Sequence, residues 1–173
     1  QLTACLLIVV TTIGMLVHLY SVGYMAHDPG RWRFFAYLNL FMFSMLLLVL
    51  GDSWLSVFAA WELVGLSSYL LIGFWNHNPV YATAAKKAFV VNRVGDLGLS
   101  VAILIMFFTF GTVTFAGVLG SAAGASESTL TWIGLALLLG LHGVPRVRAV
   151  VSEDALPASA EWISAAADAS PGT

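Results

Sequence analysis

The sequence predicts an all-α fold, a polytopic bundle of transmembrane helices. Of the 173 residues, 60% are hydrophobic and only 9% are charged, and the mean hydropathy is +0.91. A soluble globule of this length needs far more polar side chains to cover its surface. Four apolar runs are long enough to cross a hydrocarbon layer about 30 Å thick, and a fifth is too short. The net charge of -2, with no basic cluster, argues against nucleic acid as a partner.

The first apolar run covers Leu2–Tyr24 and predicts a membrane-spanning helix. No basic residue precedes this run and no Ala-x-Ala site follows it, so we expect an internal helix of a longer protein rather than a signal peptide. His18 is more typical of a packed or interfacial histidine than of a proton carrier. Cys5 is the only cysteine, which excludes an internal disulfide and a cysteine-based metal cage.

Two further spans follow at close intervals. A polar connection, Met25–Arg33, contains the turn signal Asp-Pro-Gly and leads to a second helix, predicted over Phe34–Leu50. The short turn Gly51-Asp52 then opens a third helix, predicted over Ser53–Trp75. Because this turn is so short, the second and third helices should be antiparallel neighbours.

The third span carries one carboxylate, Glu62, well inside its apolar run. At about 1.5 Å per residue, Glu62 lies roughly 15 Å from the start of the run, near the middle of the hydrocarbon layer. A charged side chain there costs at least about 2.5 kcal/mol and usually faces a protein interior, a partner or a water-filled path. Glu62 is therefore the first candidate functional residue.

The fourth helix is predicted over Ala84–Phe110 and contains four charged residues. Arg93 and Asp96 are three residues apart, so they share a helix face and can pair. A structural ion pair is the simpler interpretation, and it predicts that Asp96→Asn lowers the amount of assembled protein. The alternative makes the pair part of a charged chain along the membrane midplane. Lys86 and Lys87 can extend to the headgroups, although Lys87 lies nearer to these charged turns.

The last part of the chain is predicted to contain no complete span. Residues 111–129 are rich in Gly, Ala, Ser and Thr and predict an exposed connection with room for a short interfacial helix. A fifth apolar run, Leu130–Leu141, is too short to cross the membrane. From His142 the composition becomes polar and Ala-rich without apolar periodicity, which predicts a weakly ordered tail over 142–173. The chain thus divides into a membrane part, 1–141, and this tail.

The basic residues also predict an orientation. They fall in the first and third connections, at the start of the fourth helix and after the fifth: Arg31, Arg33, Lys86, Lys87, Arg146 and Arg148. The second and fourth connections contain only Asp52 and Glu127 as charged residues. By the positive-inside rule, the first and third connections lie in the cytoplasm.

Two motifs in the third and fourth helices resemble one family. They read Trp61-Glu62-x-x-Gly65-x-x-Ser68-Tyr69-Leu70-Leu71-Ile72-Gly73-Phe74 and Lys87-Ala88-Phe89-Val90-Val91-Asn92-Arg93-Val94-Gly95-Asp96. With supporting pieces near His18 and Arg33, they resemble the long antiporter-like membrane subunit of proton-pumping NADH:quinone oxidoreductase, respiratory complex I, over residues 1–141. The resemblance implies that the five predicted helices are the third to seventh of that family. It also implies that Glu62 belongs to a half-channel, with Arg93 and Asp96 among the charged residues of the membrane arm.

The chain departs from the family pattern near Leu141. The family continues with Gly-Lys-Ser-Ala-Gln, whose lysine is the partner of the glutamate, whereas this chain reads Leu141-His142-Gly143-Val144-Pro145-Arg146. The nearest cations that remain in the sequence are Lys87 and Arg93. A reading-frame change near Leu141 would explain the abrupt change of composition, and a divergent tail is the alternative.

The resemblance implies a function in proton translocation coupled to quinone reduction, as one subunit of an enzyme complex. The relay candidates are Glu62, Lys87, Arg93 and Asp96. No nucleotide-binding or cysteine-cluster pattern is present, so NADH, flavin, iron-sulfur clusters and quinone are expected on other subunits. The expected partners are the other membrane subunits of the complex, especially a neighbouring antiporter-like subunit, together with lipid and protons. The Ala- and Gly-rich composition favours a bacterial plasma membrane over a mitochondrion. The alternatives are a subunit of a multisubunit sodium/proton antiporter and a truncated fragment without transport.

Overall fold

The structure, a computed structural model, describes residues 1–150, with side chains described for residues 1–140. In this part of the chain every regular element is a helix. In chain order they are α1 (Leu2–Tyr24), α2 (Arg31–Leu50), α3 (Trp54–Ile72), α4 (Pro79–Phe110), α5 (Phe115–Ser121), the 3-10 helix η1 (Ala122–Gly124) and α6 (Glu127–Val150). Four of these, α1 to α4, are long and apolar enough to cross a membrane. The predicted all-α bundle with four full spans is confirmed.

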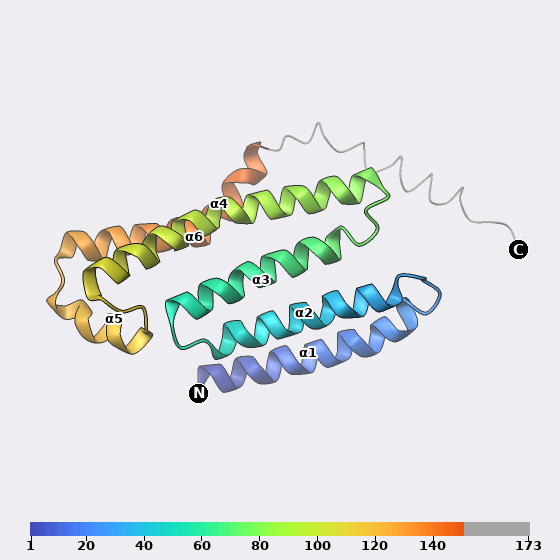
Figure 1. Cartoon of the computed structure of the whole chain (residues 1–173), viewed down its shortest axis with the longest axis horizontal. Helices are drawn as coiled ribbons and strands as arrows, with labels where there is room; N and C mark the ends of the chain where they lie inside the picture. Colours follow the sequence, from blue (N-terminus) through green and yellow to red (C-terminus); the bar gives the residue numbers. More distant parts are fainter. Residues whose placement is uncertain (151–173) are drawn as a thin grey trace, which may run out of the picture.

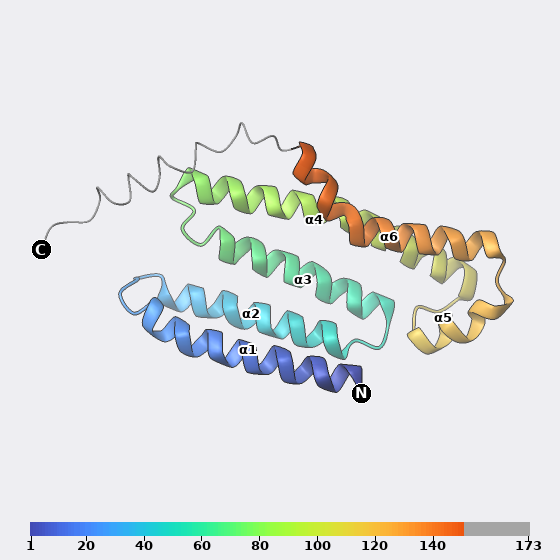
Figure 2. The same cartoon turned by 180° about the vertical axis from the view of Figure 1, so that it is seen from behind.

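The four spans lie side by side in chain order, each antiparallel to the one before (Figures 1 and 2). α2 packs between α1 and α3, α3 packs against α4, and α6 returns along α4. α6 also completes the main hydrophobic core cluster, in which Ala102 and Met106 of α4 meet Ile133 and Ala136 of α6.

Three predicted helix starts, those of α2, α4 and α6, were too late in the sequence. α4 begins at Pro79 rather than at Ala84, because Asn78 caps it by accepting a hydrogen bond from the Val80 amide at 3.0 Å and proline suits the first helical turn. α2 begins at Arg31 rather than at Phe34, directly after the turn that ends at Gly30. The added residues are Arg31-Trp32-Arg33 in α2 and Pro79-Val80-Tyr81-Ala82-Thr83 in α4.

The segment after α4 contains a short helix, for which the predicted exposed connection left room. α5 occupies part of the predicted connection, and its Val118 is buried in the cluster between α4 and α6. The predicted bounds of the fifth helix, Leu130–Leu141, are wrong at both ends, since α6 runs from Glu127 to Val150. The rest of the predicted tail, 151–173, lies outside the described residues.

Hydrogen bonds between connecting segments show which of them lie at the same end of the bundle. At one end Asp28, between α1 and α2, accepts hydrogen bonds from Trp75 Nε1 at 2.9 Å and from the Gly30 amide at 2.6 Å. The Trp75 and Gly30 hydrogen bonds lower the pKa of this carboxyl below its usual value. At the other end the Trp54 amide donates to the Val113 carbonyl at 2.9 Å. The first and third connections therefore share one end, as the orientation prediction requires.

Glycine allows α4 and α6 to come into backbone contact. A Cβ at Gly98 would lie 2.6 Å from the Gly140 amide nitrogen and 2.8 Å from the Ala136 carbonyl oxygen. We expect Gly98→Ala to destabilise the α4–α6 contact by about 1–3 kcal/mol, the usual range for overpacking. The thermal midpoint of the chain in detergent checks this. Gly134→Ala is the matched control, because a Cβ there meets nothing within 4 Å, and an equal loss in both variants would contradict the prediction.

Candidate functional site

Glu62 lies in the middle of α3. The helix has 19 residues, Trp54–Ile72, and Glu62 is next to its central residue. At about 1.5 Å per residue the helix is roughly 28 Å long, close to the thickness of the hydrocarbon layer. Glu62 thus lies at the middle of a helix of spanning length, as its predicted position near mid-depth requires.

Two charged side chains of α4 meet Glu62 at this depth. Arg93 Nη1 forms an ion pair with Glu62 Oε2, and its distance to Asp96 Oδ2 is 3.9 Å. The exposed side-chain fractions are 47% for Arg93, 21% for Glu62 and 8% for Asp96. The three residues form a charge cluster in which one guanidinium faces two carboxylates, and the deepest member is Asp96.

Two aromatic residues hold this charge cluster in place. Trp61 Nε1 donates a hydrogen bond to Asp96 Oδ1 at 3.0 Å, so neighbouring residues of α3 contact both acidic and basic members of α4. The Phe89 ring lies one turn before Arg93, with the guanidinium carbon 4.8 Å from its centroid. Cation–π contact of this kind stabilises a cation that is partly removed from water. Neither aromatic contact was predicted from the sequence.

The structure changes the predicted pairing of Arg93. The i,i+3 relation to Asp96 exists, but it is the longer of the two contacts, and the closer partner is Glu62 on another helix. The sequence gives the spacing along one helix, whereas the register between α3 and α4 depends on their packing. Arg93 is thus a neighbour of the first candidate residue rather than part of a separate pair.

Lys87 does not join the charge cluster. It is exposed, and among the described side chains no carboxylate lies within ion-pair distance of it. Six residues separate it from Arg93, which places it about 240° around the helix and roughly 9 Å along it. Of the four predicted site residues, the structure brings together Glu62, Arg93 and Asp96 and leaves Lys87 apart.

His18 has the contacts of a packed histidine. Its Nδ1 lies 2.7 Å from the Gly14 carbonyl oxygen and its Nε2 lies 3.3 Å from Asn39 Oδ1. Both ring nitrogens are therefore engaged, and the ring is next to Phe35 of α2. This geometry supports the packing interpretation given to this residue.

The charge cluster can exchange a proton but has no metal-binding composition. With all three groups ionised it carries one net negative charge, so one proton can be taken up when the guanidinium moves away from a carboxylate. Among the described residues no group of three His, Cys, Asp or Glu side chains is placed to hold a metal ion.

The structure reverses the expectation for Asp96→Asn. Arg93 keeps Glu62 as its partner, and the asparagine oxygen can still accept the Trp61 hydrogen bond, so we expect normal assembly and a stability change within about 1 kcal/mol. Asp96→Leu is the informative comparison, because it leaves the indole N–H without its acceptor at a typical cost of about 1–3 kcal/mol. Quantifying assembled protein in membranes by native electrophoresis checks both. Loss of assembly in Asp96→Asn would restore the interpretation of an essential Arg93–Asp96 pair.

The charge cluster lies in a segment that matches a known protein family. Residues 51–145 match the family described as NADH:quinone oxidoreductase/Mrp antiporter, TM. The chain belongs to this family. Residues 1–35 also match the family described as NADH-Ubiquinone oxidoreductase (complex I), chain 5 N-terminus. The antiporter match contains Glu62, Lys87, Arg93 and Asp96, so the charge cluster lies wholly within the shared antiporter segment.

Individual relatives of this antiporter family agree. The chain is 58% identical over 140 residues to NADH-quinone oxidoreductase subunit L of Mycobacterium tuberculosis, covering 81% of this chain and 22% of the relative. It is 48% identical to NADH-ubiquinone oxidoreductase chain 5 of Cryptococcus neoformans, over 81% of this chain and 21% of the relative. Subunit L of Campylobacter jejuni is 45% identical over 78% of this chain and 23% of the relative. The resemblance inferred from the motifs is confirmed, and the chain spans about a fifth of the length of these relatives.

Proposed function

We propose that this chain is part of an antiporter-like membrane subunit that moves protons in a proton-pumping NADH:quinone oxidoreductase. The observation that carries the proposal is the charge cluster: a carboxylate at mid-depth of α3, paired with a guanidinium that also faces a second carboxylate. Buried ionisable groups of this kind mark proton pathways in membrane proteins. The names of the relatives support this choice of enzyme complex.

The charge cluster works as an electrostatic switch. While Arg93 contacts Glu62, the carboxylate is stabilised in its ionised form. When the guanidinium moves toward Asp96, Glu62 loses its partner and binds a proton, and return of the guanidinium releases the proton again. The side chain of Arg93 is half-exposed, which leaves it room for this displacement. Arg93 thus takes the role of the mobile cation within the described residues.

The redox chemistry belongs elsewhere in the proposed complex. NADH, flavin, iron-sulfur clusters and quinone are assigned to other subunits, and the partners of this chain are other membrane subunits, first of all a neighbouring antiporter-like subunit. The proposed location is a bacterial plasma membrane, supported by the bacterial relatives and by the composition.

A subunit of a sodium/proton antiporter is the second candidate, because the matched family includes Mrp antiporters. Membrane vesicles from cells that carry the full-length subunit distinguish the two. We expect NADH addition to acidify the vesicle interior at a rate that does not depend on sodium, and deletion of the subunit to lower this rate. A proton flux that needs an imposed sodium gradient and ignores NADH would favour the antiporter. No change on deletion would favour a fragment without transport.

The orientation gives a separate prediction. His77 is exposed in the connection between α3 and α4, so in a Cys5→Ser background His77→Cys should react with an impermeant thiol reagent only when the cytoplasmic face is open. Ser128→Cys, exposed at the start of α6 and at the opposite end of the bundle, is the control and should react from outside intact cells. The reverse labelling pattern would contradict the predicted topology.

A further inference from the structure

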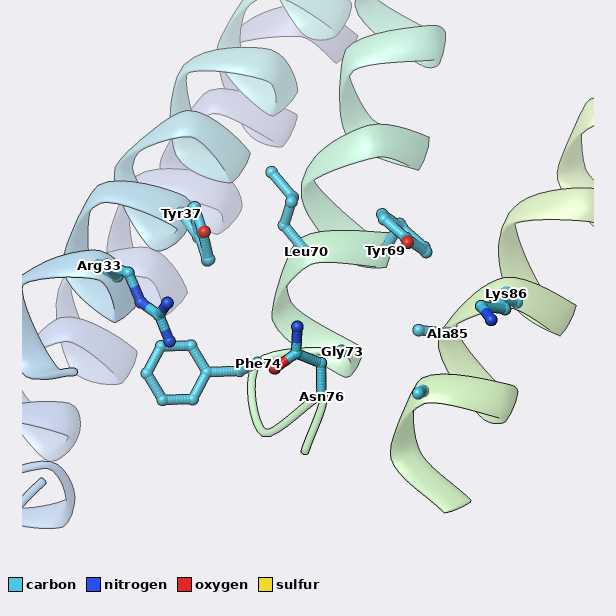
Figure 3. Close-up of a pocket in the computed structure, with 10 residues that line it drawn as sticks. Arg33, Tyr37, Tyr69, Leu70, Gly73, Phe74, Asn76, Ala85 and Lys86 are labelled. Carbon is cyan, nitrogen blue, oxygen red and sulfur yellow. The ribbon is translucent and has the colours of Figure 1, made fainter. Parts of the chain in front are cut away.

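A second polar site lies at the end of the bundle that contains the basic residues. A cavity of about 360 Å³ lies between α2, α3 and α4, and its lining includes Arg33, Tyr37, Tyr69, Asn76 and Lys86 (Figure 3). This volume is within the roughly 300–1,000 Å³ typical of small-molecule sites. The proposed proton switch does not use this cavity.

The cavity has a positive charge without a matching carboxylate. Arg33 from α2 and Lys86 from α4 are its charged lining residues, and no Asp or Glu lines it. Among the described side chains neither cation forms an ion pair, and Arg33 instead lies over the Phe74 ring at 5.4 Å. Asp28, which accepts hydrogen bonds from the Trp75 indole and the Gly30 amide, also attracts Arg33, but it does not line the cavity. An anionic ligand would add a negative charge on the cavity side of the two cations.

The cavity is also lined by neutral polar side chains that have no hydrogen-bond partner among the described residues. Within the described part of the chain the hydroxyls of Tyr37 and Tyr69 and the side-chain amide of Asn76 have no hydrogen-bond partner. All three line the same cavity as the two cations, and Figure 3 shows Tyr37 on α2, Tyr69 on α3 and Asn76 in the connection before α4. Cationic and neutral donors together are suited to the oxygens of a phosphate and of hydroxyl groups attached to it.

The depth of the cavity indicates where such a phosphate would come from. At about 1.5 Å per residue, Arg33 and Lys86 lie roughly 11 and 13 Å from the midpoints of their helices, near the edge of a hydrocarbon layer about 30 Å thick. The Trp75 ring lies edge-on to Tyr24 and tilted to Tyr81 at the same end, as expected of an aromatic belt at the membrane interface. Lipid phosphates occupy this level of the membrane.

We propose that this cavity binds the headgroup of an anionic phospholipid, with Arg33 and Lys86 as its cationic donors and the tyrosine and asparagine groups as its neutral donors. Basic pockets between transmembrane helices on the cytoplasmic side recognise headgroups in this way. The bound lipid would join α2, α3 and α4 at this end of the bundle.

Photolabelling of the full chain in phosphatidylcholine nanodiscs tests the proposal. The probe is a phosphatidylglycerol with a diazirine in its headgroup, and the label should map to residues 33–37 and 69–86. Arg33→Gln and Lys86→Gln should each raise the probe fraction needed for half-maximal labelling by about five-fold, the effect of one basic residue at an anionic surface. Arg31→Gln is the matched control, because Arg31 is a cation of the same end that lies against Phe35 and does not line the cavity.

Arg33→Lys separates loss of charge from loss of fold, since it should retain most of the labelling. Unchanged labelling in both glutamine variants, or equal labelling by a zwitterionic phosphatidylcholine probe, would overturn the proposal. Displacement of the probe by millimolar inorganic phosphate would also overturn it, because the site would then bind free phosphate. A negative result for lipid binding would not contradict the proposed proton switch, because Glu62, Arg93 and Asp96 do not line this cavity.

Discussion

Arg93→Met should destabilise the contact between α3 and α4 by about 3 kcal/mol, the lower end of the range for breaking a buried ion pair. The substitution preserves much of the side-chain volume but leaves Glu62 and Asp96 facing each other without a cation. Two carboxylates in this position must share a proton or separate. We use the lower end of the range because Arg93 is half-exposed. Assembled protein in membranes and the thermal midpoint in detergent both measure the loss.

Two further variants test the cause of this destabilisation. Arg93→Lys keeps the positive charge and should recover most of the stability, although it loses the planar contact with Phe89. The double variant Arg93→Met with Glu62→Gln should recover stability as well, because it removes the unpaired charge on α3. If Arg93→Met alone were as stable as the unaltered chain, the ion pair would contribute nothing to the stability of the α3–α4 contact.

The sequence was sufficient for the fold because lipid limits the possible structures. Backbone groups in hydrocarbon must be hydrogen-bonded internally, so an apolar run of spanning length becomes a helix. α1 therefore has the predicted bounds Leu2–Tyr24. The errors occurred at the ends of helices, at Arg31, Pro79 and Glu127 and after Leu141, because an apolar run does not report where a helix is capped or how far its backbone continues.

The members of the site could be predicted, but their geometry could not. An ionisable residue within an apolar span is conspicuous, and this signal identified Glu62, Arg93 and Asp96. Which carboxylate is the partner of Arg93 depends on the sliding and rotation of α3 against α4, which many side-chain contacts determine together. The Trp61 hydrogen bond to Asp96 was missed for the same reason. Lys87 was predicted as a site residue because it is close to Arg93 in the sequence. It points to a different side of α4 from Arg93, because the two residues are about 240° apart around the helix.

Glu62→Gln should abolish the proton switch while preserving the fold. The amide keeps the size of the side chain and can still accept a hydrogen bond from Arg93, and Asp96 still balances the guanidinium charge. It cannot bind and release a proton. Removing a group that transfers protons typically slows the step by about 10²–10⁴-fold, so flux through this site should almost cease while assembly remains normal. Glu62→Asp retains the acid with a shorter reach and should have a milder effect.

The number of protons translocated per electron tests the central claim most directly. It should be measured in NADH-energised vesicles that contain the full-length subunit, with Glu127→Gln as the control, because Glu127 is exposed in the first turn of α6 and lies outside the charge cluster. The account predicts a clear fall in this ratio for Glu62→Gln and the unaltered ratio for Glu127→Gln, at equal amounts of assembled complex. An unaltered ratio in Glu62→Gln would mean that the carboxylate at the centre of α3 is only a packing residue.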